Sequence, residues 1–399
     1  METILFELFP AQSHHLMAFK MAKLLKDAGY RVIFGSVPEM QEIVQRHGFD
    51  FQSVKPWVVQ PLGHKLLLKK KGVPFPDKKE RLEEVRKNLD IFNQQIMQRK
   101  PDVVLLDRHS MVSKSMFYKK LGVKVILVSP MPDPEPAPNV PPFSSRFFPR
   151  ENWLSKKYIS SLWFSEYLKR RLRIFKYQML YPSLNDLTIY RQLASAMGKN
   201  PKDVKIPHDG SGYYTETTPR IILSATDLDF PRPEIKGVYN IGPLIDLPAD
   251  ESKSTDARYE AMKSIVTKGN SAVIYCSLGM LVDFCTDQKI KLYQKIKKVA
   301  ILAPTDFFVL CTGDDLDNSN LLPLPPNLFV FKSLPQKDLL KYCTIMINHG
   351  GLNSITECIF NEVPVIAYPP SHMADHSSNS ARGSLSWVGI ARKSRSRQS

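Results

Sequence analysis

A histidine, two glycines and several helix-capping residue types follow one another within one short segment late in the chain. In order, the segment contains Ile345 to Ile347, His349, Gly350, Gly351, Asn353, Ser354 and Glu357. The apolar residues predict a buried strand, the glycines permit a tight turn, and Glu357 follows Ser354 at capping-box spacing, which predicts a helix. The free N–H groups at a helix start favour a phosphate, and His349 adds a donor. The segment therefore indicates a phosphate site, and the alternative is an ordinary strand-to-helix loop.

Two adjacent histidines, His14 and His15, lie between the first strand and the first helix that the sequence predicts. The strand is expected over residues 4–8 and the helix over residues 16–28. Functional side chains of parallel α/β sheets gather beyond the carboxyl ends of the strands. A histidine in this turn is therefore placed to act as a general base. The alternative is a histidine that caps the helix or lies on the surface.

A carboxylate, Asp107, ends the apolar strand that is expected over residues 103–106. An imidazole is a better base when a carboxylate orients it and stabilises its protonated form. Since both groups are expected at carboxyl ends of strands, Asp107 is a candidate partner for the histidine. The alternative is an aspartate that caps the following helix.

Short apolar strands alternate with amphipathic helices along most of the chain. The first series has strands expected at 4–8, 31–35, 103–106, 123–129 and 221–225, and helices at 16–28, 38–47, 77–99 and 114–121. The second has strands at 272–278, 306–310, 328–332, 345–348 and 365–368, and helices at 286–300, 337–342 and 354–361. A proline-rich loop at 130–149 and a basic helical segment at 152–198 lie within the first part. This alternation predicts two doubly wound α/β domains, 1–245 and 257–399, joined by a polar linker at 246–256.

Further motif residues surround the histidine and the two glycines. They are Pro335-Gln336 before the strand, Pro364 and Pro369-Pro370 around the next strand, and Asp375-His376-Ser377-Ser378-Asn379 after it. This block resembles the donor-binding signature of the UDP-glycosyltransferase superfamily. It is most similar to the bacterial members that glycosylate macrolides, carotenoids and other lipophilic acceptors. The resemblance implies the GT-B architecture, in which two Rossmann-like domains face each other across a cleft.

The same resemblance implies a role for each matching residue. Residues 9–14 resemble the family's Pro-x-x-Gly-His motif with Ser13 in place of glycine, which selects His14 over His15 as the base. The strand that ends at Asp107 resembles the one that supplies the supporting carboxylate. The donor would be held by Ser277, His349, Gly351, Asn353 and Ser354 around the diphosphate, Glu357 at the ribose, Gln336 beside the uracil, and Asp375 and His376 at the sugar. His376 stands where the family has glutamine, so the identity of the sugar is left open.

The implied activity is an inverting, metal-independent transfer of a hexose from a UDP-sugar to a hydroxyl of a lipophilic small molecule, without a cofactor. His14 would deprotonate the acceptor and Asp107 would support His14. One alternative is a UDP-sugar 2-epimerase, which would surround the sugar with acid and base groups rather than with apolar acceptor contacts. Another is a degenerate nucleotide-binding protein. It is favoured by the end of the chain, which departs from the family after Arg382 and becomes basic and serine-rich.

The chain carries a formal net charge of +16, and much of it lies between Arg146 and Lys176. This segment contains nine Lys or Arg residues against Glu151 and Glu166, interspersed with aromatic residues. Such a mixture suits the surface of an anionic membrane and also suits nucleic acid. The ordinary alternative is a solvated helix whose aromatic residues form core. No recognised nucleic-acid module accompanies the segment, so nucleic acid is not expected as a partner.

Several features predict a cytoplasmic protein. No run approaches the roughly 18 apolar residues needed to span a bilayer, and the N-terminal residues lack the basic region of a signal peptide. The five cysteines are scattered without paired or zinc spacing, which predicts reduced thiols. Asp227-Leu228-Asp229 has metal-binding spacing, but a structural role is preferred and no metal is expected. If the basic segment binds lipid, the protein would also contact the inner face of the membrane.

Overall fold

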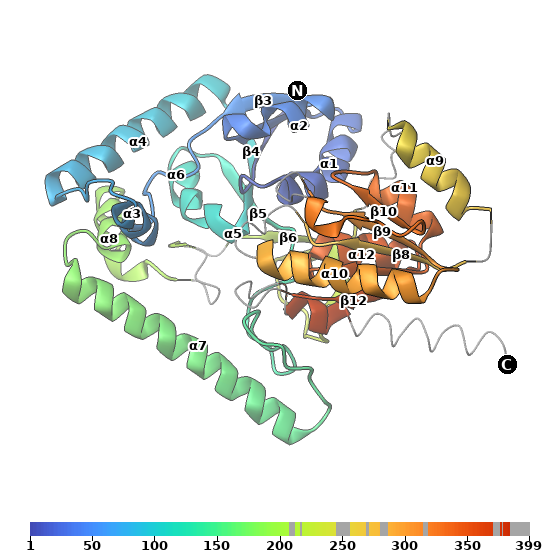
Figure 1. Cartoon of the computed structure of the whole chain (residues 1–399). Helices are drawn as coiled ribbons and strands as arrows, with labels where there is room; N and C mark the ends of the chain where they lie inside the picture. The colour runs from blue at the N-terminus through green and yellow to red at the C-terminus, as the bar shows by residue number, and fades with distance from the viewer. Residues whose placement is uncertain are drawn as a thin grey trace. The chain divides into compact units, whose positions relative to one another are not determined.

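In the part of the chain that the structure describes, the strands form two separate parallel sheets, one of seven strands and one of five (Figure 1). The computed structural model describes residues 1–206, 212–215, 218–244, 256–268, 271–279, 286–313, 318–369, 376 and 378–383. The chain divides into two compact units. The first comprises Met1–Val140, Glu151–Thr226 and Pro231–Leu244, and the second comprises Pro141–Arg150, Asp227–Phe230 and Ile245–Ser399. Most of the linker expected at 246–256 lies outside the described residues, so the predicted domain limits stay a prediction.

The sheet of the first unit has the strand order β3-β2-β1-β4-β5-β6-β7, and its neighbouring strands pair in parallel. The strands are β1 (Thr3–Glu7), β2 (Arg31–Ser36), β3 (Asp50–Ser53), β4 (Val103–Asp107), β5 (Lys124–Ser129), β6 (Arg220–Ala225) and β7 (Val238–Gly242). Leu5 and Val104 enter one hydrophobic cluster, whereas Phe6 and Leu105 enter another. Because successive side chains of a strand point to opposite faces, core lies on both faces of this sheet.

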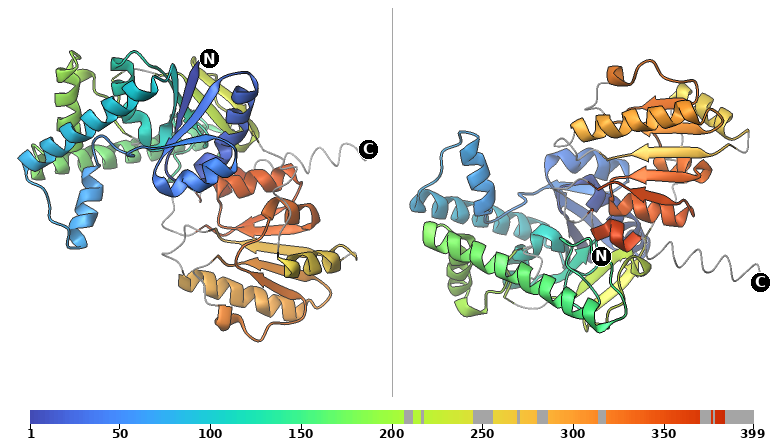
Figure 2. Two further views of the ribbon diagram at one scale, coloured as in Figure 1. Left: turned by 90° about the horizontal axis from the view of Figure 1, so that it is seen from above. Right: turned by 60° about the horizontal axis from the view of Figure 1, so that its bottom comes forward.

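Helices occupy the connections between these strands (Figure 2). They are α1 (Gln12–Asp27), α2 (Gln41–Arg46), α3 (Leu62–Lys70), α4 (Lys78–Arg99), α5 (Arg108–Met111), α6 (Ser115–Lys120), α7 (Trp153–Leu180) and α8 (Asp186–Ala196). Of these, α1, α2, α5 and α6 contact the strands of the sheet. The charged helix expected over residues 77–99 is confirmed as α4. Asp77 accepts from the Glu80 N–H at 2.8 Å, and Glu80 accepts from the Asp77 N–H at 2.9 Å, which completes a capping box.

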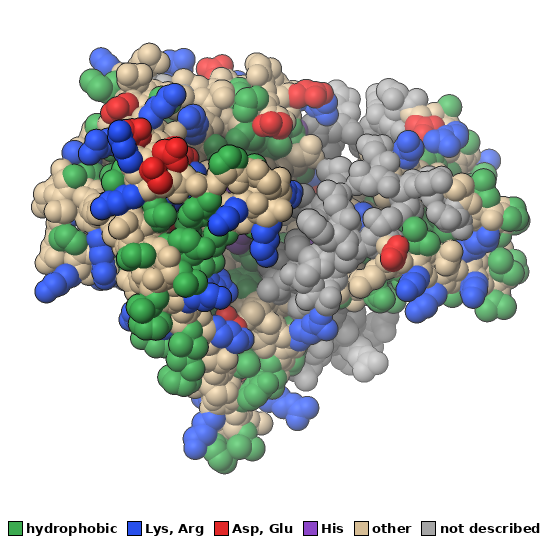
Figure 3. Space-filling model, turned by 60° about the vertical axis from the view of Figure 1, so that its left-hand side comes forward, with side chains coloured by type: hydrophobic (Ala, Val, Ile, Leu, Met, Phe, Trp, Pro, Cys, Tyr) green, Lys and Arg blue, Asp and Glu red, His purple; other side chains and the backbone are tan. Residues whose placement is uncertain are grey.

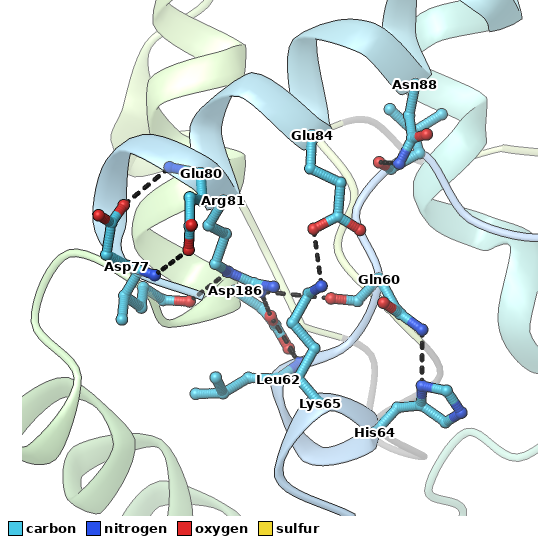
Figure 4. A network of polar contacts seen from close by, with 12 residues as sticks. Gln60, Leu62, His64, Lys65, Asp77, Glu80, Arg81, Glu84, Asn88 and Asp186 are labelled. Carbon is cyan, nitrogen blue, oxygen red and sulfur yellow. Dashed lines mark hydrogen bonds and ion pairs between the residues drawn. The ribbon is translucent and has the colours of Figure 1, made fainter. Parts of the chain in front are cut away.

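A buried ion pair ties α4 to α8 (Figure 4). The Arg81 side chain is only 1% exposed and donates to Asp186 Oδ1 at 2.7 Å and to the Leu184 carbonyl at 2.8 Å. Asp186 also accepts from the Leu62 N–H at 3.0 Å, where α3 begins. Burial raises the pKa of the Asp186 carboxyl, and the neighbouring arginine opposes that shift. The pair therefore fixes three helices of the first unit around one charged contact.

The second unit has the strand order β10-β9-β8-β11-β12, again with parallel pairing. Its strands are β8 (Val273–Ser277), β9 (Phe307–Cys311), β10 (Leu328–Phe331), β11 (Ile345–Asn348) and β12 (Val365–Ala367). Its helices are α9 (Ala257–Val266), α10 (Thr286–Leu302), α11 (Gln336–Leu339) and α12 (Leu352–Phe360), and residues 376 and 378–383 are also helical. Tyr275 and Val309 enter one cluster and Cys276 and Leu310 the other, so this sheet also has core on both faces.

Strand order brings the predicted site segments to common edges. In the first unit β1 pairs with β4, and Glu7 lies opposite Leu106, one residue before Asp107. In the second unit β8 pairs with β11, and Ser277 lies opposite Asn348, one residue before His349. Each sheet therefore gathers its candidate residues at the carboxyl ends of two neighbouring central strands.

Two expectations about local structure are wrong. Helix α1 begins at Gln12 rather than residue 16, so His14 and His15 lie inside its first turn. Helix α12 begins at Leu352 with Gly351 as its N-cap, so the expected capping box of Ser354 and Glu357 does not form. By contrast, the basic segment expected to be helical at 152–198 is helical in α7, which ends at Leu180, and in α8, which begins at Asp186. Polar residues beside a turn carry too little periodic signal to place a helix start.

A buried arginine, Arg382, anchors the two short segments that group with the second unit. Its side chain is 1% exposed and donates to Asp229 Oδ1 at 3.0 Å. Its guanidinium also lies 4.4 Å from the ring centre of Phe143 and 5.1 Å from that of Phe230. Arg382 thus binds residues of 141–150 and 227–230 at once, and the Asp229 carboxylate is held by an arginine.

Hydropathy of the helices bears on the relation to membranes. Among the residues that the structure describes, no helix combines the length and the apolar character that crossing a bilayer demands.

Candidate functional site

The first group of candidate residues is the pair of His14 and Asp107 in the first unit. The His14 Nδ1 atom lies 2.6 Å from Asp107 Oδ2. Because a carboxylate can only accept, His14 Nδ1 carries the hydrogen of this bond and Nε2 keeps a lone pair in the neutral ring. The His14 side chain is 13% exposed, so the protein holds the ring in place while part of it stays accessible to solvent. This arrangement can take a proton from a hydroxyl at Nε2.

The Asp107 carboxylate is built to stay ionised. It is completely buried, and besides His14 it accepts from the Phe9 N–H at 3.1 Å and from the His109 N–H at 2.7 Å. Burial alone would raise the pKa of this carboxyl, but the His14 ring and the two N–H donors outweigh burial and leave the pKa below its usual range. A carboxylate in this state orients the imidazole and stabilises its protonated form.

The neighbouring histidine is placed differently. His15 is completely buried, and its Nδ1 lies 3.0 Å from the Ala11 carbonyl of the preceding turn. Its ring centre lies 6.1 Å from that of Phe34, among core residues. Burial lowers the pKa of His15, which favours the neutral ring. The structure therefore brings His14, and not His15, to the carboxylate.

In the second unit, two glycines make room for the His349 ring. A side chain at Gly279 would put its Cβ 2.7 Å from His349 Cε1, and one at Gly351 would put its Cβ 2.5 Å from His349 Nε2. Gly350 has a φ of +87°, which glycine adopts at little cost. The two glycines of this turn therefore have different roles: Gly350 allows the chain to turn, and Gly351 leaves space for the imidazole.

His349 is held as a neutral ring. Burial, together with the nearby His376 and Lys289, lowers its pKa to about 4, although the backbone of Ser277 works in the opposite direction. The rings of His349 and His376 meet edge to face, with centres 4.6 Å apart. Among the described residues, His349 Nδ1 is buried without a hydrogen-bond partner. A neutral imidazole carries one N–H donor and one acceptor nitrogen.

The start of α12 offers further donors. Its N-cap residue, Gly351, supplies no side chain to the N–H groups of the first turn, which includes Asn353 and Ser354. The N–H groups of a helix's first turn carry positive partial charge and suit an anion. Ser277 lies at the end of the adjoining β8, so the turn, the helix start and the serine share one edge of the sheet.

A second set of polar residues joins α11 to α12. Gln336 Nε2 donates to Glu357 Oε2 at 2.7 Å and to Ser354 Oγ at 3.2 Å, while Tyr275 donates to Gln336 Oε1 at 3.1 Å. Burial raises the pKa of the Glu357 carboxyl, and the bond from Gln336 opposes that shift. The structure therefore brings together Gln336, Ser354 and Glu357.

One predicted residue, Asp375, lies outside the described residues. His376 is 7% exposed and contacts the His349 ring, so the structure gives it a place beside the glycine turn. The predicted residues thus form two groups, one in each unit, and their roles in binding and catalysis stay predictions.

Lys289 of α10 was not predicted from the sequence. Its side chain is only 4% exposed, and Nζ lies 3.4 Å from the Gly279 carbonyl, beside the His349 ring. The sequence contains a signal for this burial, because the spacing of Lys289 places it on the same helix face as the buried Tyr293, Ile296 and Ala300. A lysine at an apolar position of an amphipathic helix is seldom buried without a partner.

The lowered pKa of His349 predicts a pH-dependent stability. The ring titrates at about 4 in the folded protein and near its usual 6.5 in the unfolded chain. Stability is therefore fully present above pH 6.5 and falls as the pH decreases from 6.5 towards 4, by at most about 1.4 kcal/mol per pH unit. Urea unfolding at several pH values should show this fall in the wild type and a shallower one in His349→Asn. Equal slopes would contradict the neutral state of His349.

Comparison with known proteins shows which family and which relatives the chain is similar to. Residues 153–396 match the family described as UDP-glucoronosyl and UDP-glucosyl transferase. UDP-glucuronosyltransferase 2B16 of Oryctolagus cuniculus is 28% identical over 151 residues, which cover 37% of this chain and 26% of that protein. The chain matches less than a third of the length of such curated relatives.

Solved structures match over nearly the whole chain. The glycotransferase of kitacinnamycin has a TM-score of 0.61 at 17% identity and covers 96% of this chain and 84% of its own. The spinosyn rhamnosyltransferase complexed with thymidine diphosphate has a TM-score of 0.54 at 15% identity, with coverages of 98% and 91%. At these identities the matches show the fold, which is the GT-B fold of two doubly wound domains. Since the family match extends over more than half of its length, the chain belongs to the UDP-glucoronosyl and UDP-glucosyl transferase family.

Proposed function

We propose that this protein transfers a hexose from a UDP-sugar to a hydroxyl group of a lipophilic small molecule, with inversion at the sugar carbon. The observation that carries the proposal is the His14–Asp107 pair, in which a buried carboxylate holds an imidazole 2.6 Å away. Such a pair deprotonates a hydroxyl, which is the step that an acceptor alcohol requires. The family match and the glycine turn at His349 support a nucleotide-sugar donor.

The proposed reaction is a single displacement. The acceptor oxygen attacks the anomeric carbon of the sugar while its proton passes to His14 Nε2. The bond from that carbon to the diphosphate oxygen breaks, and UDP leaves with the bonding electrons. An α-linked donor therefore gives a β-glycoside. Asp107 stabilises the imidazolium that forms, because its carboxylate stays ionised beside the ring.

The leaving diphosphate would be held by the second unit. The N–H groups at the start of α12, with Asn353 and Ser354, supply donors, and His349 supplies a further N–H. Glu357 would accept from ribose hydroxyl groups, and Gln336 would lie beside the uracil. Ser277, Asp375 and His376 complete the proposed donor contacts. In this proposal positive partial charge of the protein, rather than a metal ion, offsets the charge of UDP as it leaves.

The proposed acceptor is lipophilic because the motif residues resemble those of family members with lipophilic acceptors; the solved structures with this fold include the glycotransferase of kitacinnamycin and a spinosyn rhamnosyltransferase. The spinosyn enzyme carries thymidine diphosphate, so thymidine diphosphate sugars belong in the same test. The competing function is nucleotide binding without transfer, which the basic, serine-rich sequence after Arg382 suggested; the family match itself extends to residue 396.

A UDP-release assay tests the proposal. Purified protein is incubated with UDP-glucose, UDP-glucuronic acid, UDP-N-acetylglucosamine and a thymidine diphosphate sugar, each with a mixed panel of lipophilic alcohols and phenols. We expect acceptor-dependent release of nucleotide and a β-glycoside with an α-linked donor, identified by the proton coupling at the anomeric position. Nucleotide binding without any acceptor-dependent release would favour the degenerate binder, and conversion of the sugar itself would favour an epimerase.

The position of Lys289 predicts that this residue contributes to binding of the donor. Its ammonium lies beside His349, and its charge is the smallest of the causes that lower the pKa of that ring. Changing Lys289→Met should therefore weaken UDP binding roughly tenfold, the scale of a contact to a charged group. Calorimetry measures the affinity, and Lys291→Met, an exposed position on the same helix, is the matched control. Equal affinity in both variants would assign Lys289 a purely structural role.

A further inference from the structure

Helix α7 is attached to the first unit along one side only. Of its 28 residues, Ser155 and Ile159 are buried, and Trp163 anchors the same side by donating from Nε1 to the Val140 carbonyl at 2.8 Å. The ordinary interpretation of this segment places its aromatic residues in the core. The structure contradicts that interpretation, because most of these rings lie on the outer side.

The outer side of α7 carries large apolar residues along its whole length. They are Trp153, Leu154, Tyr158, Phe164, Tyr167, Leu168, Leu172, Phe175, Met179 and Leu180, and each is more than 40% exposed. At about 100° per residue these positions fall mainly on one half of the helix, opposite the buried Ser155 and Ile159. We call these ten residues the outer stripe. Figure 3 shows hydrophobic and basic side chains mixed over the lowest part of the molecule, which α7 forms.

The outer stripe is flanked by positive charge. The basic residues of α7 are Lys156, Lys157, Lys169, Arg170, Arg171, Arg173 and Lys176, and its acidic residue is Glu166. Glu166 lies 3.2 Å from Lys169, so even this carboxylate is partly offset. Lys157 lies 4.9 Å from the Trp153 ring centre, and the Arg171 guanidinium lies 5.2 Å from that of Tyr167. Cations and aromatic rings therefore occupy the same surface.

The positive charge of α7 distinguishes between the two partners that the outer stripe could bind, a second copy of the chain and a membrane. A second copy of the chain would bring another row of lysines and arginines against this one, which like-charge repulsion disfavours. An anionic bilayer accepts the apolar side chains at the boundary of its headgroups and attracts the flanking cations. We propose that α7 is a peripheral membrane-docking helix that lies flat on anionic lipid through the outer stripe. This proposal goes beyond the proposed function and does not depend on it.

Vesicle binding by the full chain tests the proposal. The probes are vesicles of phosphatidylcholine alone and of phosphatidylcholine with about a third phosphatidylserine, which sets a negative surface potential. We expect co-sedimentation with the anionic vesicles, weakening as salt rises from about 50 to 500 mM because salt screens the attraction. A blue shift of tryptophan emission on binding should accompany it. Equal recovery with neutral and anionic vesicles would overturn the proposal.

Two sets of variants locate the surface. The charge variant changes Lys157, Lys169, Arg171 and Lys176, all exposed, to Gln. We expect it to bind anionic vesicles roughly 10- to 100-fold more weakly, since each basic residue near such a surface contributes several-fold. The matched control changes Lys78, Lys79, Arg86 and Lys87, exposed on α4, to Gln and removes the same charge from the same unit. An equal loss in the two variants would indicate attraction by net charge and would sink the docking role of α7.

The apolar variant changes Phe164, Leu168, Leu172 and Phe175 to Gln, which keeps helix propensity. It should lose both vesicle binding and the emission shift, while its thermal unfolding, followed by circular dichroism, stays that of the wild type and reports correct folding. Concentration-dependent self-association of the wild type, abolished in this variant and accompanied by no vesicle binding, would replace the membrane with a second copy of the chain.

Discussion

Replacing His14 by alanine is expected to reduce glycosyl transfer by roughly 10²- to 10⁴-fold, the usual contribution of a general base. UDP affinity should stay nearly unchanged, because His14 belongs to the first unit and the proposed nucleotide contacts belong to the second. Steady-state nucleotide release measures the rate, and calorimetry with UDP measures the affinity. The separation of the two readouts distinguishes a lost base from a misfolded protein.

Two further variants sharpen the test of His14. Asp107→Asn removes the charge that stabilises the imidazolium and should lower the rate. The Phe9 N–H donates to Oδ2 and the His109 N–H to Oδ1, so the single amide oxygen can keep one of these two bonds, and thermal unfolding measures what the loss of the other costs. His47→Gln, at the end of α2, is the control for removing a histidine from the same unit and should retain the wild-type rate. Substantial transfer by His14→Ala would refute the assignment of the base.

Replacing His349 or Glu357 by alanine is expected to weaken UDP binding by roughly 1–3 kcal/mol each, the scale of a hydrogen bond to a charged group. His349 loses its N–H donor, and Glu357 loses the acceptor proposed for the ribose. Calorimetry at pH 7 suits the measurement, because a ring that titrates at about 4 is neutral there in the folded protein. Glu362→Ala, just beyond the end of α12, is the control for removing a carboxylate. Unchanged affinity in both variants would mean that the glycine turn is only structural.

The two changes should differ in how they affect the turn. His349 fills the space between Gly279 and Gly351, so its truncation also empties a cavity beside the start of α12. Glu357→Gln keeps the shape of the side chain and the contact with Gln336, and so isolates the charge of the carboxylate. A smaller loss in Glu357→Gln than in Glu357→Ala would show that an acceptor oxygen, rather than a negative charge, is what the ribose needs.

The local pattern of the sequence was sufficient to predict the architecture of the protein. Alternating apolar strands and helices predicted two doubly wound α/β domains, and the fold and the family match confirm this class. The strand at 345–348 was placed to the residue, and the α4 capping box follows directly from Asp77 and Glu80. The short strand β3, the strand β7 and the helices α3 and α9 were not predicted, because their sequences are short or lack a clear apolar period.

The sequence by itself determined which residue types stand at the ends of the central strands, because strand ends and turns are written in local apolar runs, glycines and capping residues. The motif resemblance had selected His14 over His15, but only the tertiary structure shows that His14 contacts Asp107, a residue 93 positions away in the chain. The tertiary structure also determines that Lys289 is buried beside His349, that Arg382 donates to Asp229, and that most aromatic residues of α7 face outward. Burial and pairing depend on which distant elements pack together, and spacing along a single chain does not carry that information.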